Sequence, residues 1–522
     1  MSIEHSEEDH HLEMKPAAAL SNGNLGGNKA LQIEEPLIFE QGSKGRTGVD
    51  LPVPSERVDK LGKLKRINPI GLPGLSEPEV VRHYTRLSRN NYAIDMGLYP
   101  LGSCTMKHNP RLNERLASLP GLADIHPLQP ESTVQGALAV IEEVGNWLKV
   151  LTGFPAIAMS PAAGAQGELC GLMAIRSCLI ARGDPRATVL VPDSAHGTNP
   201  ATATMCGYKI ESVPSDERGR VDLNALLARL GPDIAALMLT NPNTCGLFEN
   251  NIIEIAAAVH QAGALFYCDG ANFNAIVGKV RPVDLGIDIM HLNLHKTFST
   301  PHGGGGPGAG PVVMTDELAP YAPLPWITHD GKKFGLIEQP EGSAKESFGR
   351  MRAWHGQFGM FVRALAYMLS HGGDGLRQVA EDAVLNANYI LSGIKEKFHV
   401  TYAGTCMHEV LCDDQFIKDT ETTTFDIAKG LIDEGYHPMT IYFPLTAHGA
   451  MLIEPTETES KQTLDHFVEA LQRIADRAQS DQPGNLRRSP LHAPRRRLDE
   501  TRAARQPTLR WSPPPTTSAK SE

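Results

Sequence analysis

Several features of membrane, secreted and disulfide-rich proteins are missing from this sequence of 522 residues. No apolar run approaches the roughly 18 residues of a membrane span. The N-terminus is acidic and rich in histidine, whereas a secretory leader is basic and then apolar. The eight cysteines are scattered without a C-x-x-C pair, which disfavours a disulfide framework. We therefore expect reduced thiols, a cytoplasmic location and no membrane partner.

Nucleic-acid and nucleotide binding have equally little support. The net charge of −11 is modest for this length and argues against a general nucleic-acid binder. Gly303, Gly305 and Gly308 formally satisfy G-x-G-x-x-G, but Pro307 interrupts the motif and a strand-like stretch, residues 311–314, follows in place of a helix. A Walker lysine is also missing, so neither a dinucleotide nor a P-loop site is predicted.

One lysine stands out among the residues that are present. Lys296 lies in a turn of small residues behind an apolar run. A lysine at the end of a buried strand can lose its proton, because desolvation disfavours the ammonium form, and it can then form a Schiff base with an aldehyde such as pyridoxal phosphate (PLP). Considered alone, Lys296 could equally be a surface lysine.

Asp269 strengthens this reading, because it ends another short apolar run upstream, residues 264–268. An ionised, partly buried carboxylate keeps the pyridine nitrogen of PLP protonated, so that the ring can withdraw electrons from a substrate. Ala271 leaves room beside the ring. Asp269 alone could merely cap a turn, but Asp269 and Lys296 together, in this order, predict a PLP site with no metal.

The chain is long enough for two domains with hydrophobic cores plus extensions, since 41% of its residues are hydrophobic. We expect a flexible extension over residues 1–36, and an arm over 37–130 that contributes to the active site and a subunit interface. A large domain should span 131–345 and a small one 346–480. A tail, 481–522, should be docked to about residue 511.

Strands and helices alternate in the large domain. A helix with a Ser132 cap should end at Gly153. Residues 188–191, 234–239 and 264–268 read as short strands, with a helix over 252–262, which predicts parallel pairing. Ligands of such sheets bind beyond the carboxyl ends of the strands.

Polar loops follow these strand ends. His196 lies in the first, where its flat ring could stack on a pyridine ring or could simply be a structural histidine. Thr244 lies in the second, where hydroxyl and amide groups could contact the cofactor or form an ordinary turn. Asp269 forms the third. We expect the three loops to converge on one site.

A phosphate group needs backbone N–H groups at the start of a helix. Gly164 and Ala165 provide a stretch of small residues before a helical pattern over 169–180, although an ordinary helix-opening turn would look similar.

The region after residue 350 should form the small domain, with helices over 425–432 and 464–474 and a strand over 451–453. Arg495, Arg496 and Arg497 are followed closely by Asp499 and Glu500 and lack neighbouring aromatics, so we expect them in a tail docked on a partner subunit.

Nine unusual strings, in order, carry a resemblance to a known family. They are residues 99–107, 126–130, 162–168, 193–200, 241–246, 293–298, 349–352, 442–457 and 497–511. The chain resembles subunit 2 of bacterial glycine dehydrogenase (decarboxylating), the PLP-bearing P-protein subunit of the glycine cleavage system. His108 replaces a usual tyrosine and Gln166 a common histidine, and residues 1–36 and 512–522 lie outside the resemblance.

The resemblance implies an α/β fold-type I architecture, that of the aspartate aminotransferase-like PLP-dependent transferases, with a large PLP domain and a smaller C-terminal α/β domain. It implies Lys296 as the Schiff-base lysine, Asp269 on the pyridine nitrogen and His196 on the ring face. It places four residues near the phosphate: Gly164, Ala165, Asn293 and His295. Four more resemble a segment that holds the carboxylate of glycine, or else packs the arm: Tyr99, Ser103, Thr105 and Lys107.

The implied reaction is the decarboxylation of glycine, with release of carbon dioxide. The aminomethyl group passes to the oxidised lipoyl arm of the H-protein, so the enzyme is formally an oxidoreductase. Because fused P-proteins are about twice as long, the length implies the split form, paired with subunit 1 as an α₂β₂ heterotetramer.

Two alternatives stay open from the sequence. A cysteine desulfurase shares the aspartate and His-Lys pattern but needs a mobile cysteine nucleophile, and Cys406 and Cys412 are the only late cysteines. A non-catalytic scaffold would keep the fold without the cofactor, which the presence of Lys296, Asp269 and His196 together argues against.

Overall fold

A computed structural model describes residues 34–49, 51–52, 60–68, 70–302, 308–480 and 484–512. The chain forms two compact units, one from Met1–Tyr92 with Leu491–Glu522 and the other from Ala93–Pro490. The boundary between Tyr92 and Ala93 falls inside residues 37–130, which were predicted to form a single arm. The predicted extension up to residue 33, the glycines 303–306 and the last ten residues lie outside the described residues.

The first unit joins the N-terminal arm to the C-terminal tail. Its longest helix is α1 (Glu77–Asn90), and the tail carries α14 (Glu500–Arg505). The ring of Trp511 stacks on Phe39 with centroids 5.2 Å apart, and Arg495 pairs with Glu34 at 2.5 Å. These contacts join the tail to the arm of the same chain, and docking of the tail on a partner subunit stays a prediction.

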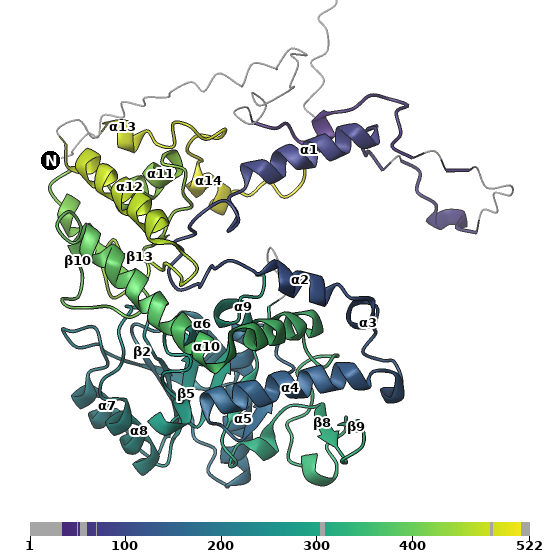
Figure 1. Cartoon of the computed structure of the whole chain (residues 1–522), viewed down its shortest axis with the longest axis vertical. Coiled ribbons are helices and arrows are strands. Elements are labelled where there is room, and N and C mark those ends of the chain that lie inside the picture. The colour runs from purple at the N-terminus through teal and green to yellow at the C-terminus, as the bar shows by residue number, and fades with distance from the viewer. Residues whose placement is uncertain are drawn as a thin grey trace, which may run out of the picture. The chain divides into compact units, whose positions relative to one another are not determined.

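A seven-stranded sheet organises the second unit (Figure 1). Its strands, in spatial order, are β1 (Ala156–Ala158), β7 (Val312–Met314), β6 (Ile289–Leu292), β5 (Leu265–Gly270), β4 (Ile234–Thr240), β2 (Thr188–Pro192) and β3 (Lys209–Val213). β7 runs antiparallel to β1 and β6, and the remaining neighbours are parallel. The predicted strands and their parallel pairing are confirmed.

Helices cover both faces of this sheet. All seven residues of β4 are buried, and because side chains alternate along a strand they serve two cores. Leu237 and Leu239 join the core with α4 (Gln135–Thr152), α8 (Ile252–Gln261) and the first half of α10 (Phe358–Ile394). Met238 joins the core with α5 (Gly164–Ala181) and α6 (Thr198–Met205). Figure 1 shows α4 and α10 lying side by side.

The predicted start of α4 is wrong. Ser132 lies inside a short 3-10 turn, Glu131–Thr133, which the Thr133 N–H closes on the Pro130 carbonyl at 2.8 Å. The helix therefore begins after this turn, at Gln135. Its predicted end is confirmed, since Gly153 takes the left-handed conformation (φ 81°) that glycine adopts readily.

A second, antiparallel sheet lies in the C-terminal part of the same unit, with strands in the order β10 (His399–Val400), β11 (Val410–Asp413), β13 (Met451–Ile453) and β12 (Thr440–Ile441). Its core includes α11 (Thr424–Asp433), α12 (Lys461–Gln479) and the second half of α10. The two helices and the strand predicted here are confirmed.

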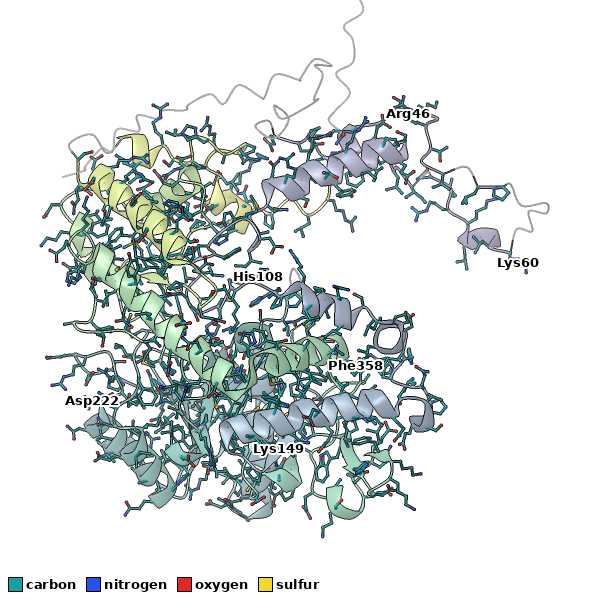
Figure 2. All side chains as sticks on the ribbon, in the orientation of Figure 1. Arg46, Lys60, His108, Lys149, Asp222 and Phe358 are labelled. Atoms are coloured by element: carbon teal, nitrogen blue, oxygen red, sulfur yellow. The ribbon has the colours of Figure 1, made fainter. Side chains whose placement is uncertain are left out.

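Shorter elements complete the described chain. Asp222 caps α7 (Leu223–Arg229), with its carboxylate accepting from the Ala225 N–H at 3.0 Å (Figure 2). None of the described helices combines the length and apolar character that a membrane span needs. The other short helices and strands are α2 (Arg111–Ala117), α3 (Pro120–Ala123), α9 (Leu294–Thr297), α13 (Gly484–Arg487), β8 (Trp326–His329) and β9 (Phe334–Ile337).

Leu237→Ala tests the central core. Leu237 has no exposed surface, so we expect the free energy of unfolding to fall by about 3 kcal/mol in urea denaturation, because a cavity replaces buried methyl groups. The control Leu227→Ala removes a leucine that is 42% exposed and should cost under about 0.5 kcal/mol. Equal losses in the two variants would contradict the assigned layers.

Candidate active site

A cavity of about 140 Å³ lies beyond the carboxyl ends of the parallel strands. The three polar loops predicted to converge there do so. Nine of the thirteen predicted site residues line it: Ser103, Gly164, Ala165, His196, Thr244, Asp269, Ala271, Asn293 and Lys296. Two larger cavities, of about 440 and 450 Å³, lie elsewhere in the unit and contain neither Lys296 nor Asp269.

Lys296 reaches the cavity from α9, the single helical turn that follows β6. Its side chain is largely buried, with 8% of the residue exposed. The Nζ atom donates a hydrogen bond to the Ser103 carbonyl at 2.9 Å. The amine is therefore held inside the cavity, where an aldehyde could reach it.

Asp269 lies at the carboxyl end of β5 and is 3% exposed. Burial raises its pKa, but His291, the Asn199 amide, the Ala271 N–H and Lys296 together outweigh burial and bring the pKa below its ordinary value. Asn199 Nδ2 donates at 3.1 Å, the Ala271 N–H at 2.9 Å, and His291 Nε2 lies 3.4 Å away. The carboxylate is thus ionised and suited to a protonated ring nitrogen.

A second buried acid faces the same cavity. Burial, reinforced by the charge of Asp269, raises the pKa of Glu168 to about 7. Thr198 Oγ1 donates to Glu168 at 2.7 Å. The two carboxyl groups thus differ widely in pKa, an arrangement typical of sites that carry out proton chemistry.

His196 lies at the mouth of the cavity. Its Nδ1 atom is 2.8 Å from Thr198 Oγ1, and its ring meets Phe443 edge-on at 5.6 Å. Although part of the ring faces solvent, the burial of the remainder lowers its pKa. A neutral imidazole is therefore available, and its stacking on a cofactor ring stays a prediction.

The start of α5 suits a phosphate group. A Cβ atom on Gly164 would meet the Asn293 amide at 2.9 Å, so a larger residue there would displace the Asn293 side chain. The first N–H groups of a helix have no partner within it and attract anions. Asn293 Oδ1 and Thr240 Oγ1 are buried polar atoms without a partner among the described residues, as expected of a site built around a polar ligand.

His295 does not line the cavity. Its Nδ1 accepts from the Ala309 N–H at 3.3 Å, and burial, with the nearby His302 and Lys296, lowers its pKa to about 3. It is therefore neutral and offers no positive charge to a phosphate group.

Only Ser103 of the four predicted glycine-binding residues lines the cavity. Lys107 is fully buried and pairs with Glu457 at 2.6 Å, because a buried ammonium needs a counter-charge. Tyr99 stacks on His437 with centroids 4.2 Å apart. Thr105 donates to Glu454. These three residues hold the segment in place and do not reach into the cavity.

Comparisons with known proteins show the family of this chain. Residues 379–493 match the model of the glycine dehydrogenase C-terminal domain, and residues 167–306 match aminotransferase class-V. A probable glycine dehydrogenase (decarboxylating) subunit 2 of Caulobacter vibrioides is 61% identical over 500 residues, which cover 95% of each chain.

The chain belongs to the glycine dehydrogenase (decarboxylating) subunit 2 family. Solved structures agree in fold. A crystal structure of a glycine decarboxylase (P-protein) of the glycine cleavage system matches with a TM-score of 0.67 at 22% identity, over 79% of this chain and 94% of that one. A cysteine desulfurase of Escherichia coli matches with a TM-score of 0.56 at 15% identity, over 73% and 95%. The predicted fold-type I class is confirmed.

Three residues at or beside the cavity were not predicted from the sequence: Asn199, His291 and Glu168. Asn199 lies within the polar loop that contains His196, and His291 lies directly opposite Asp269 in the register of β5 and β6. A pairing register could have revealed His291. Glu168 lies in α5, one residue before the helical pattern predicted over 169–180.

Glu168→Gln tests the raised pKa in the protein freed of cofactor. Folding raises this pKa from 4.5 to about 7, so the folded chain holds a proton that the unfolded chain releases, and wild-type stability falls as pH rises through this window. The variant lacks this loss. We expect the unfolding free energy of the variant, measured relative to wild type by urea denaturation, to rise by about 3 kcal/mol between pH 4.5 and pH 8. A difference that stays constant with pH would contradict the raised pKa.

Proposed function

We propose that this chain is the PLP-bearing subunit that decarboxylates glycine in the glycine cleavage system. The observation that carries the proposal is the placement of Lys296 and Asp269, both buried, in one cavity. Membership of the glycine dehydrogenase (decarboxylating) subunit 2 family supports glycine as the substrate.

Bound PLP would supply an electron sink for the electrons of the bond between Cα of glycine and its carboxylate when that bond breaks. Lys296 would hold it covalently, Asp269 would keep its ring nitrogen protonated, and His196 would cover its ring. Gly164, Ala165 and Asn293 would hold the phosphate group. Ala271 and Thr244 border the same space.

Orientation of glycine decides which of its bonds breaks, because only a bond perpendicular to the ring system is activated. Ser103 is the one predicted substrate residue in the cavity, and its carbonyl already accepts from Lys296. We expect the segment around Ser103 to hold the carboxylate of glycine. Lys107, which does not reach the cavity, would support this segment through its hydrogen bonds to Glu457 and Asn274.

The acceptor would be the oxidised lipoyl arm of the H-protein, which takes the aminomethyl group and is reduced. The name subunit 2 of the relatives supports a partner, subunit 1, and we propose an α₂β₂ heterotetramer. All eight cysteines are free, which agrees with the expected reducing cytoplasm.

A cysteine desulfurase is the weaker candidate. Neither Cys406 nor Cys412 lines the cavity. Burial raises the pKa of the Cys406 thiol to about 12 and also raises that of Cys412, which lies in β11. Neither thiol would be an effective nucleophile near neutral pH.

Lys296→Ala should abolish the visible absorbance band that PLP gains when it forms an imine with a lysine. Borohydride should fix the cofactor on the wild-type peptide that contains Lys296, as mass spectrometry would report. The exposed Lys279, paired with Glu381 at 2.7 Å, gives the control Lys279→Ala, which should keep the band. A band retained by Lys296→Ala would contradict the assignment, and a wild-type protein that takes up no PLP would favour the scaffold reading.

Exchange of labelled bicarbonate into glycine tests the reaction itself. With subunit 1 present, we expect lipoylated H-protein to stimulate the exchange by at least about tenfold, because the lipoyl arm is the proposed partner in the site. H-protein without its lipoyl group is the control. Release of alanine and sulfur from cysteine, without glycine exchange, would support the desulfurase instead.

A further inference from the structure

A buried cluster with no assigned role lies behind the proposed substrate segment. His408, Glu409 and Glu454 are each at most 1% exposed. One donor or acceptor atom from each lies within 4.8 Å of the others. Both ring nitrogens of His408 and the Oε2 atoms of both glutamates have no hydrogen-bond partner among the described residues.

The two glutamates hold the segment that touches Lys296. Glu409 Oε1 accepts from the Ser103 N–H, and Glu454 Oε1 accepts from the Thr105 hydroxyl. The Ser103 carbonyl in turn accepts from Lys296 Nζ at 2.9 Å. A single residue, Ser103, therefore links the Glu409 carboxyl group to the proposed catalytic amine.

The backbone of this segment needs such support. Ser103 takes a left-handed conformation (φ 65°), which is uncommon for a residue with a side chain. Leu101 forms a bridge with Ile453 of β13, and Thr440 Oγ1 donates to the Gly102 carbonyl at 2.7 Å. The segment thus extends the second sheet, and the two glutamates fix its far end.

The charges in the cluster indicate that the two glutamates keep one proton between them. Neither glutamate contacts a lysine or arginine within the described ranges, and His408 Nε2 lies 3.8 Å from Glu409 and 4.0 Å from Glu454. Burial, then Lys296, lowers the pKa of His408 to about 3, so it is neutral. Burial and Glu454 hold the pKa of Glu409 well above its ordinary value, and burial raises that of Glu454 to about 7. Two adjacent buried carboxyl groups do not both ionise without a cation.

We propose that Glu409 and Glu454 are a pair of positioning residues that together keep one proton and use their Oε1 atoms to fix residues 101–105 against Lys296. The role in glycine binding rests on the proposed function, whereas the hold on the segment does not. A carboxyl group that keeps its proton is uncharged, so a neutral amide at position 409 keeps the charge of the pair and can still accept from the Ser103 N–H.

Amide hydrogen exchange of the peptide that contains residues 101–105 tests the hold directly, with the cofactor-free protein. Glu409→Ala should speed exchange there by at least about tenfold, whereas Glu409→Gln should stay within about threefold of wild type. Asp426→Ala is the matched control: it removes another buried acid, which accepts from the Thr423 N–H at 2.8 Å in α11, and it should leave this peptide unchanged.

Glycine exchange with the full complex gives the second readout. Glu409→Ala should raise KM for glycine by at least about tenfold with a smaller effect on kcat, and Glu409→Gln should restore KM to within about threefold. If Glu409→Ala does not fold, Thr105→Val should speed the same amide exchange and Thr105→Ser should not.

An unchanged rate of amide hydrogen exchange in residues 101–105 of Glu409→Ala or Thr105→Val would overturn the proposal. So would a Glu409→Gln variant that behaves like Glu409→Ala, because a bound cation would need both acids ionised. If wild type shows no glycine exchange while the amide pattern holds, the proposed function fails and the positioning pair stands.

Discussion

The ionised state of one buried carboxylate, Asp269, is the constraint on which the rest of the site depends. Burial alone would protonate it. Asn199 from α6, His291 from β6 and the N–H of Ala271 counter this from three directions. Each pKa unit is worth about 1.4 kcal/mol, so these contacts together decide whether a protonated acid or a carboxylate faces the cavity.

The neighbouring charges are arranged around the same constraint. Glu168 lies close enough for the charge of Asp269 to help raise its pKa, which leaves one acid ionised and a second able to hold a proton. Lys296 provides the nearby positive charge. The Ser103 carbonyl accepts from the Lys296 amine, and the Ser103 N–H donates to the Glu409 carboxyl group. Ser103 therefore links the second sheet to the proposed catalytic lysine.

What could be predicted from the sequence was local. Strands such as β4 and β5 are short apolar runs with polar residues at their ends, so Asp269 and His196 follow directly from the pattern. Lys296 was predicted from the apolar stretch before it taken together with Asp269, because either residue alone was ambiguous. Gly153 ended its helix as predicted, since glycine alone adopts that conformation easily. The predicted start of the same helix was wrong, because residues 131–133 form a 3-10 turn in place of a serine-capped helix end, and such a turn leaves no periodic pattern in the sequence.

What could not be predicted depends on register and on distant pairing. His291 faces Asp269 only because β5 and β6 align in one register. Lys107 was expected to meet the carboxylate of a substrate, but Glu457, 350 residues later, neutralises it. The roles of Glu409 and Glu454 likewise appear only when the second sheet folds beside residues 101–105.

The most direct test of the account is the ¹⁵N chemical shift of the ring nitrogen in PLP labelled at that atom and bound to the protein. The account predicts a protonated ring nitrogen in the wild type across neutral pH, and loss of that proton in Asp269→Asn, where a neutral amide replaces the carboxylate. An unprotonated nitrogen in the wild type, or the same shift in both proteins, would contradict the role assigned to Asp269.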